Sequence, residues 1–593
     1  MKINRLIAIG AVVAAGALVL AGCSSGGGSE VVSGTSISAA QNGAMTSMNA
    51  LTATGYSTYN SNISYLFQST FNYYDNTPKL VKNTSFGTYK KLSSSPLTIK
   101  YTINDGVKWS DGVPVNASDM LLAWASSISK YNKGSVNFTG INAGSGTDLI
   151  TKVPKLSDNN RSMTVIYDKP YVDWEPLTAL NPNLPAHIVW EEAGIDKKTG
   201  TDAQAAIIKA IQGDDATSLA KVAKAWKNDW NFTTTPSDKK LLVVDGPYKV
   251  TALTKNFVTL AANSQYTGSQ KPKIAKITVR FIPDQTAQVQ ALQNGEVNVL
   301  YGQATADTVK ALKGLKGISS TTSATATFEH VDLTFNNAGP FDPATYGGDA
   351  TKALEVRQAF FKVVPRQTML DRLIKPLSST AKLDDSSLFI PGQPGYSESV
   401  ARNGSADYQK VDVEAAKALL AKAGVTTPIT VRFAYANDNP RRQGEFQLIQ
   451  ASAKDAGFNV TDAGKPTSEF FDPDQGIGSG HYAYDATVFA YQLTSSTVTQ
   501  SEANTTTGNA YNYQGYSNAE VDAAWKKAEV ATSGAAAVPL QQQIDAHLWK
   551  DASTLTLFQL PDVSAWSSKI SNVGDAPYSP NIFWNFWEWS VKK

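Results

Sequence analysis

Residues 102–119 read TINDGVKWSDGVPVNASD, and the fold interpretation of the chain starts from this stretch. It continues a strand-like run, because apolar and polar residues alternate along residues 97–103. The Asp-Gly pair at 111–112 then favours a tight turn, since glycine adopts positive φ at little cost. Asn116, followed three residues later by Asp119, is typical of a helix N-terminus. The stretch therefore predicts a strand, a turn and a helix in succession.

The same succession recurs along the chain. Helices are predicted after Asp284, with Gly295 as the closing residue, over residues 412–424, and after a capping-box pair, Ser517 and Glu520. Strand patterns are found at residues 276–282, 329–335, 429–435 and 486–491. This order predicts α/β lobes with substantially parallel sheets. No repeat of fixed period indicates a solenoid or a propeller.

The N-terminus has the order of a secretory signal. Lys2 and Arg5 precede an uncharged stretch at 6–20, and LAGC follows at 20–23. The apolar stretch is shorter than the about 20 residues of a spanning helix, which disfavours a permanent transmembrane anchor. The LAGC ending resembles a bacterial lipobox, and this resemblance implies cleavage before Cys23, lipid on its thiol and acylation of the new N-terminus.

We therefore expect a signal peptide at 1–22 and a lipid-anchored flexible tether at 23–35, of which 24–29 read SSGGGS. This predicts an extracytoplasmic protein held to the outer face of the cell membrane. Cys23 is the only cysteine, so neither an internal disulfide nor a cysteine-based metal site can form. Loss of Lys2 and Arg5 with the signal lowers the formal net charge from +2 to zero, which argues against nucleic-acid binding.

Residues for catalysis or metal binding are not arranged in a known pattern. The four histidines, at 187, 330, 481 and 547, lie far apart in sequence and outside metal-ligand spacings. The run GIGSG at 476–480 misplaces its serine relative to the Gly-x-Ser-x-Gly motif of hydrolases. We therefore expect a protein without metal or cofactor that is not an enzyme. The mature chain is also too long for one hydrophobic core, which predicts at least two lobes.

Several segments, in order, resemble the extracytoplasmic solute-binding proteins of family 5, the oligopeptide- and dipeptide-binding lipoproteins of ABC importers. The most specific of them is VKWSDG at 107–112 with the helix start that follows it. The others are LPAH at 184–187, DGPYKV at 245–250, Asn263 with Tyr266, GEV at 295–297, VRQA at 356–359, AAKALLAKAG at 415–424 and GYSN at 515–518.

The resemblance implies an α/β, two-lobed clamshell of the periplasmic-binding-protein type II, with an extra subdomain on the first lobe. The chain would cross between the lobes near 328–337 and 554–561, and these segments would form the hinge. A monomer would close around a peptide or other small solute and present it to the permease subunits of an ABC importer. The implied division is lobe I from 36–75, 235–327 and 555–593, its extra subdomain from 76–234, and lobe II from 328–554.

Carried over by position, the resemblance implies five solute-binding residues, each with core or hinge packing as the alternative role: Tyr266, Glu296, Tyr491, Gln492 and Phe558. In the peptide-binding branch, an aspartate shortly after the equivalent of Tyr491 pairs with the ammonium group of the ligand. Residues 493–501 contain no acid, and Glu502 is the first carboxylate.

An ammonium group buried without a partner costs several kcal/mol, so a glycan receptor of the same fold remains an alternative to a peptide receptor. A surface hydrolase is a third possibility. The aromatic run FWNFWEW at 583–589 would either stack on sugar rings or pack the end of the first lobe.

Overall fold

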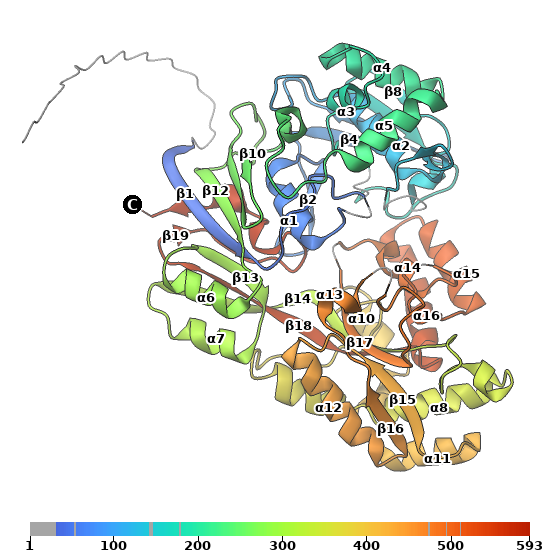
Figure 1. Cartoon of the computed structure of the whole chain (residues 1–593). Coiled ribbons are helices and arrows are strands. Elements are labelled where there is room, and N and C mark those ends of the chain that lie inside the picture. The colour runs from blue at the N-terminus through green and yellow to red at the C-terminus, as the bar shows by residue number, and fades with distance from the viewer. Residues whose placement is uncertain are drawn as a thin grey trace, which may run out of the picture.

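The computed structural model describes residues 31–52, 55–140, 146–176, 180–472, 475–493, 495–509 and 511–592. Within this part, the chain forms two halves that are joined by two long strands, β14 (Ile318–Leu333) and β18 (Thr554–Ser567) (Figure 1). One half contains the N-terminal strand, the C-terminus and most of the first 300 residues. The other contains the helices and strands between these two long strands.

One ten-stranded sheet runs through both halves in the order β10-β11-β12-β1-β13-β18-β14-β17-β15-β16. Strand β1 pairs in parallel with β12 and β13, and β15 pairs in parallel with β16 and β17, whereas the other neighbours are antiparallel. The sheet is therefore mixed, and the prediction of substantially parallel sheets was only partly right. The remaining bounds are β1 Val32–Gln41, β10 Tyr248–Leu253, β11 Phe257–Ala262, β12 Ile274–Phe281, β13 Val299–Gln303, β15 Ile429–Ala434, β16 Phe458–Asp462 and β17 Ala486–Gln492.

Strands β14 and β18 pair along both halves, with a register shift between Ala324 and Phe328. On one side of the shift, Val563 and Ala565 of β18 belong to an apolar cluster of the first half. On the other side, Leu555 and Leu557 belong to the main core of the second half. The strand predicted at 329–335 is thus the second part of a longer strand, because both of its parts are paired with β18. The positions of the hinge and of the lobe boundaries stay predictions.

The first half carries an antiparallel four-stranded sheet in the order β4-β5-β9-β8. Strand β5 buries every second residue, as its alternation predicts, and α2 begins after a capping box of Asn116 and Asp119. Asp119 also accepts a 2.9 Å hydrogen bond from the backbone N–H of Ala186, which ties the start of α3 to the start of α2. The bounds are β4 Gly87–Ser94, β5 Leu97–Ile103, β8 Lys155–Ser157, β9 Ser162–Ile166, α2 Ala117–Ser127, α3 Ala186–Glu192, α4 Gly200–Gln212 and α5 Ala216–Asn228.

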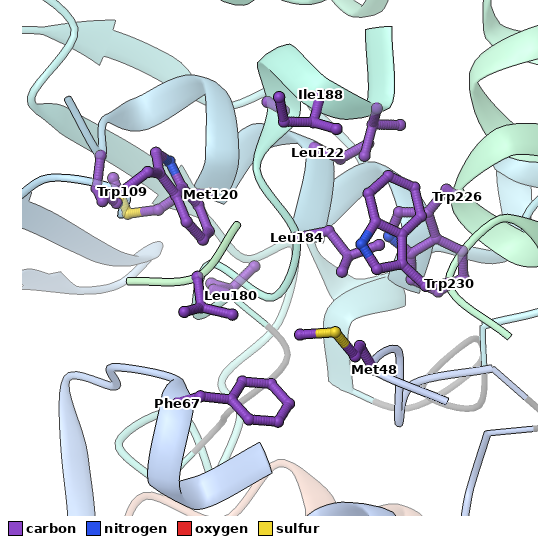
Figure 2. Close-up of a cluster of buried hydrophobic side chains, with 14 of the residues drawn as sticks. Met48, Phe67, Trp109, Met120, Leu122, Leu180, Leu184, Ile188, Trp226 and Trp230 are labelled. Carbon is purple, nitrogen blue, oxygen red and sulfur yellow. The ribbon is translucent and has the colours of Figure 1, made fainter. Parts of the chain in front are cut away.

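Large aromatic side chains fill the core of this half. Trp109, Trp124, Trp226 and Trp230 are all buried, and Figure 2 shows three of them within one cluster of apolar side chains. Truncation of a buried tryptophan to alanine typically costs about 3–5 kcal/mol. The aromatic run at 583–589 contributes Phe583, Phe586 and Trp589 to the same core, so it packs the end of the first half.

The second half surrounds its strands with helices whose ends follow local sequence signals. Asp412 caps α11, and Gly424 closes it with φ 61°, as predicted. The cap of α15 is Asn518, and the prediction of Ser517 was wrong, because the Asn518 side chain accepts hydrogen bonds from the N–H groups of Glu520 and Val521 in the first turn. The bounds in the second half are α8 Ala350–Lys362, α9 Arg366–Met369, α10 Tyr396–Val400, α11 Val413–Ala423, α12 Pro440–Lys454, α13 Thr467–Phe470, α14 Glu502–Thr505, α15 Ala519–Glu529 and α16 Gly534–Lys550. The first half also contains α1 Thr58–Phe67, α6 Gln285–Gln293 and α7 Ala306–Lys313.

Candidate functional site

A cavity of about 270 Å³ lies where the carboxyl ends of the parallel strands β1 and β13 meet the crossing strands. In open α/β sheets, ligands bind at this edge, because the loops beyond it diverge and leave a crevice. Residues of both halves line the cavity: Ala40, Gln41, Asn42, Thr58, Tyr59, Asn62, Tyr301, Gly302, Gln303, Thr327, Gln492, Asp562, Asn581 and Phe583. The lining consists mainly of amides and hydroxyls, which can hydrogen-bond a polar solute.

Asp562 supplies the carboxylate of this lining. It lies on β18 opposite Gln303 of β13, and the hydroxyl of Tyr301 donates a hydrogen bond to its Oδ2. Burial raises the pKa of the Asp562 carboxyl to about 7, although the Tyr301 hydroxyl acts in the opposite direction. Asp575 adds a second negative group nearby and also raises this pKa. A cation placed beside Asp562 would favour its charged form.

The N-terminus of α12 meets the rim of the cavity. The Nδ2 of Asn439 donates to Oε1 of Gln303 at 3.3 Å, so a residue of the second half touches a lining residue from the first. Behind this contact, Arg441 lies 3.0 Å from Glu329 and 2.5 Å from Glu445, and Arg442 lies 2.8 Å from Glu329. Burial opposes the charge on Glu329, but the two arginines outweigh it and lower the pKa to about 2. These charges are therefore paired within the protein.

The two halves also touch at a second place, which we call the 173–499 contact. Asp173, only 4% exposed, accepts hydrogen bonds from the N–H of Val498 at 2.9 Å, and from the N–H and the hydroxyl of Thr499 at 2.9 and 2.8 Å. The N–H of Val172 donates to the carbonyl of Glu529 at 2.8 Å. These bonds hold residues 172–173 of the first half against the second half.

Of the five residues that we predicted to bind solute, Gln492 lines the cavity, and it lies opposite Thr327 in the sheet. Tyr491 packs away from the lining: its ring stacks on His330 at 4.5 Å between centroids and contacts Phe489 at 5.0 Å. Phe558 is fully buried in the core of the second half. The role of each in binding stays a prediction.

The other two predicted residues lie elsewhere in the first half. Tyr266 lines a small separate cavity next to Phe86 and Asp245. Glu296 is exposed and forms a 2.9 Å ion pair with Arg280, three residues before β13 begins and therefore at the opposite end of that strand from the cavity. Cys23, the predicted lipid attachment site, lies outside the described residues.

Glu502, the first carboxylate after Tyr491, lies near the 173–499 contact and does not line the cavity. Burial, with Glu529 and Asp173 adding negative charge, raises the pKa of Glu502 to about 7. Ionisation of a carboxyl group in this environment costs free energy, and a nearby cation would reduce that cost.

The sequence did not predict the residues that form most of the polar lining of the cavity, among them Tyr301, Gln303 and Asp562. Two signals were available. The run VLYGQ at 299–303 ends a strand at the edge where ligands bind, and Asp562 is the only charged residue in the sequence of β18. Neither signal was decisive, because strand order within a sheet depends on residues far apart in sequence.

The described segments contain no group of three or more histidine, cysteine or acidic side chains arranged to hold a metal ion. In those segments, none of the helices has the length and apolar character needed to cross a bilayer.

Comparisons with known proteins agree with this architecture. The model of the family described as "Bacterial extracellular solute-binding proteins, family 5 Middle" matches residues 77–513. An uncharacterized lipoprotein of Mycobacterium tuberculosis is 23% identical over 540 residues, which cover 88% of this chain and 87% of the relative. The oligopeptide-binding protein OppA of the same species is 24% identical over 501 residues, or 82% of this chain and 73% of OppA. The crystal structure of the periplasmic EDTA-binding protein EppA superimposes with a TM-score of 0.79 at 22% identity, covering 96% of this chain and 98% of EppA.

Proposed function

Because this chain belongs to family 5 of the bacterial extracellular solute-binding proteins, we propose that it captures a peptide or peptide-sized solute between its halves and delivers it to an ABC importer. Members of this family are binding proteins and not enzymes. One observation carries the proposal. The polar cavity is lined by both halves and lies beside the two strands that join them.

The position of the cavity between the two halves would allow the protein to capture a solute by closing. A solute that bonds to β1 and β13 on one side and to Gln492 on the other makes its full set of contacts only when the halves approach each other. A ligand shifts an equilibrium between open and closed forms by the difference in its affinity for the two. The closed form would then be the one that the permease recognises.

The peptide as ligand is supported by the similarity to OppA, whose name describes an oligopeptide-binding protein. Attachment through Cys23 is supported by the LAGC sequence and by the lipoprotein relative. We include in the proposal the lobe division at residues 36–75, 76–234, 235–327, 328–554 and 555–593, and a monomeric state.

A glycan receptor is the second candidate, and the lining of the cavity favours it. Tyr59, Tyr301 and Phe583 provide aromatic rings, and the surrounding amides and hydroxyls match the hydroxyl groups of sugars. Each of these groups would also bond to a peptide backbone.

The decisive experiment identifies the natural solute. The protein is extracted from membranes with mild detergent, purified and denatured, and the released small molecules are analysed by mass spectrometry. Peptides are expected. Oligosaccharide without peptide would support the second candidate and contradict the first. A molecule that the purified protein steadily converts to a product would show that it is an enzyme.

A further inference from the structure

Asp562 is the single charged side chain in the cavity wall. Of the fourteen described residues that line the cavity, none is a lysine, arginine or histidine, and no other is an aspartate or glutamate. The wall therefore offers a negative group to the solute and no positive one. Such a wall disfavours a polyanionic solute, because nothing in it would compensate the buried charge.

The surroundings of Asp562 leave its charge without a partner. In the part of the chain that the structure describes, Tyr301 is the sole hydrogen-bond donor to its carboxylate. Asp575 lies behind it and accepts a 2.5 Å hydrogen bond from the Ser323 hydroxyl, so the second acid adds negative potential. Arg441 is the basic residue close enough to act on Asp562, and its guanidinium is engaged with Glu329 and Glu445.

A half-buried carboxylate without an ion-pair partner is costly to ionise, and the removal of water around Asp562 accordingly raises its pKa to about 7. An ammonium group within hydrogen-bond distance would reverse this cost, since charge-assisted bonds are the stronger ones. Because Asp562 lies on a strand that joins the two halves, the bond would form beside the predicted hinge.

We propose that Asp562 receives an ammonium group of the bound solute. The resemblance to peptide-binding proteins assigns this task to an aspartate after Tyr491, which residues 493–501 lack. Here a carboxylate from β18, which is separated from β17 by β14 in the sheet, takes the task over, and the solute class is a peptide with a free amine. This inference rests on the proposed function.

The test uses the membrane-extracted protein and two probes: a pool of random tetrapeptides, and the same pool with acetylated N-termini. Retained peptide is quantified by mass spectrometry after gel filtration. The wild type should retain the free-amine pool at least tenfold better than the acetylated pool. Asp562→Asn should retain the free-amine pool about tenfold less well than the wild type and should lose the discrimination. Glu502→Gln is the matched control, and it should behave as the wild type.

A pH profile separates direct recognition from a structural role. Retention of the free-amine pool by the wild type should fall as the pH is lowered from 8 to 5.5, because protonation of Asp562 removes its charge, and retention by Asp562→Asn should change little. Three titratable groups act on Asp562: Arg441 of α12, Tyr301 of β13, and Asp575, which lies after β18. Unchanged retention of the acetylated pool and a melting temperature no lower than that of the wild type show that the variant is folded.

Two results overturn the inference, and they are distinguishable. If the wild type retains neither pool, the proposed peptide function fails and the inference fails with it. If the wild type retains peptide but Asp562→Asn discriminates between the pools as well as the wild type does, the inference alone is wrong.

Discussion

Asp173→Ala should weaken the closed form by removing the acceptor of the 173–499 contact. Asp173 accepts three hydrogen bonds from Val498 and Thr499, at 2.8–2.9 Å, and is almost fully buried between the halves. In an open form, both the carboxylate and its donors would bond to water. The bonds therefore contribute to the difference between closed and open forms and not to the stability of either half.

The expected magnitude follows from these bonds. A hydrogen bond to a charged group contributes about 1.5–3 kcal/mol net, and a buried N–H left without an acceptor costs about 1–3 kcal/mol. Burial raises the pKa of Asp173, so desolvation offsets part of this gain. We therefore expect the closed form to lose about 2 kcal/mol, which is roughly a thirtyfold change in the ratio of closed to open molecules.

Two measurements check this. If the open form dominates in the absence of solute, titration calorimetry with the solute recovered from the wild type should show that Asp173→Ala binds it roughly thirtyfold more weakly than the wild type does. If the closed form dominates in the absence of solute, small-angle X-ray scattering should show a larger radius of gyration for Asp173→Ala than for the wild type. Asp168→Ala is the matched control, because this exposed carboxylate of the same segment bonds to Thr151 and not to the second half. A folded Asp173→Ala protein with unchanged affinity and unchanged radius would refute the reasoning.

Three further predictions concern charge and attachment. Burial raises the pKa of Glu502 to about 7, so the folded protein binds an extra proton between pH 4.5 and 7 and loses stability as the pH rises through this window. In urea unfolding, Glu502→Gln should therefore be about 1–2 kcal/mol more stable than the wild type at pH 8 and equal to it at pH 4. The same difference in stability between variant and wild type at both pH values would contradict this. Glu329→Gln removes the one acid paired with Arg442 among the described residues and leaves Arg441 paired with Glu445 alone, so it should lower the free energy of unfolding by about 3 kcal/mol. Glu296→Gln, at an exposed ion pair, should change it by less than about 1 kcal/mol, and equal effects of the two variants in urea unfolding would count against the buried cluster. Cys23→Ser should shift the protein from the membrane fraction to the medium or leave it unprocessed, as immunoblotting of fractions would show, and unchanged membrane attachment would exclude lipidation at this residue.

Much of the secondary structure was predictable because its signals are local. The alternation in β5, the capping box at Asn116 and the glycine that closes α11 each depend on residues within a few positions of one another. The error at Ser517 has the same origin, since Ser517 and Asn518 are both good capping residues. Only the path of the backbone decides which of two neighbouring side chains reaches the free N–H groups.

The candidate site was less predictable. Gln492 was placed by resemblance and lines the cavity, whereas the adjacent Tyr491 points toward His330, as successive side chains of a strand must lie on opposite faces. Tyr301 and Asp562 are 261 residues apart in sequence, and no local pattern connects them. Their pairing requires that β13 and β18 be neighbours in the sheet.

The sequence by itself predicted the signal and lipobox, and its motifs indicated the family and with it the class of fold. It also determined the ends of most helices, because short-range sterics, capping and hydrophobic periodicity act within a few residues. The tertiary structure alone decided which polar groups share the cavity, that no side chain in the described part of the chain forms an ion pair with Asp562, and that Asp173 joins the halves. These properties depend on burial and on distances between segments far apart in the chain, and a carboxylate acquires its altered pKa only when folding removes the water around it.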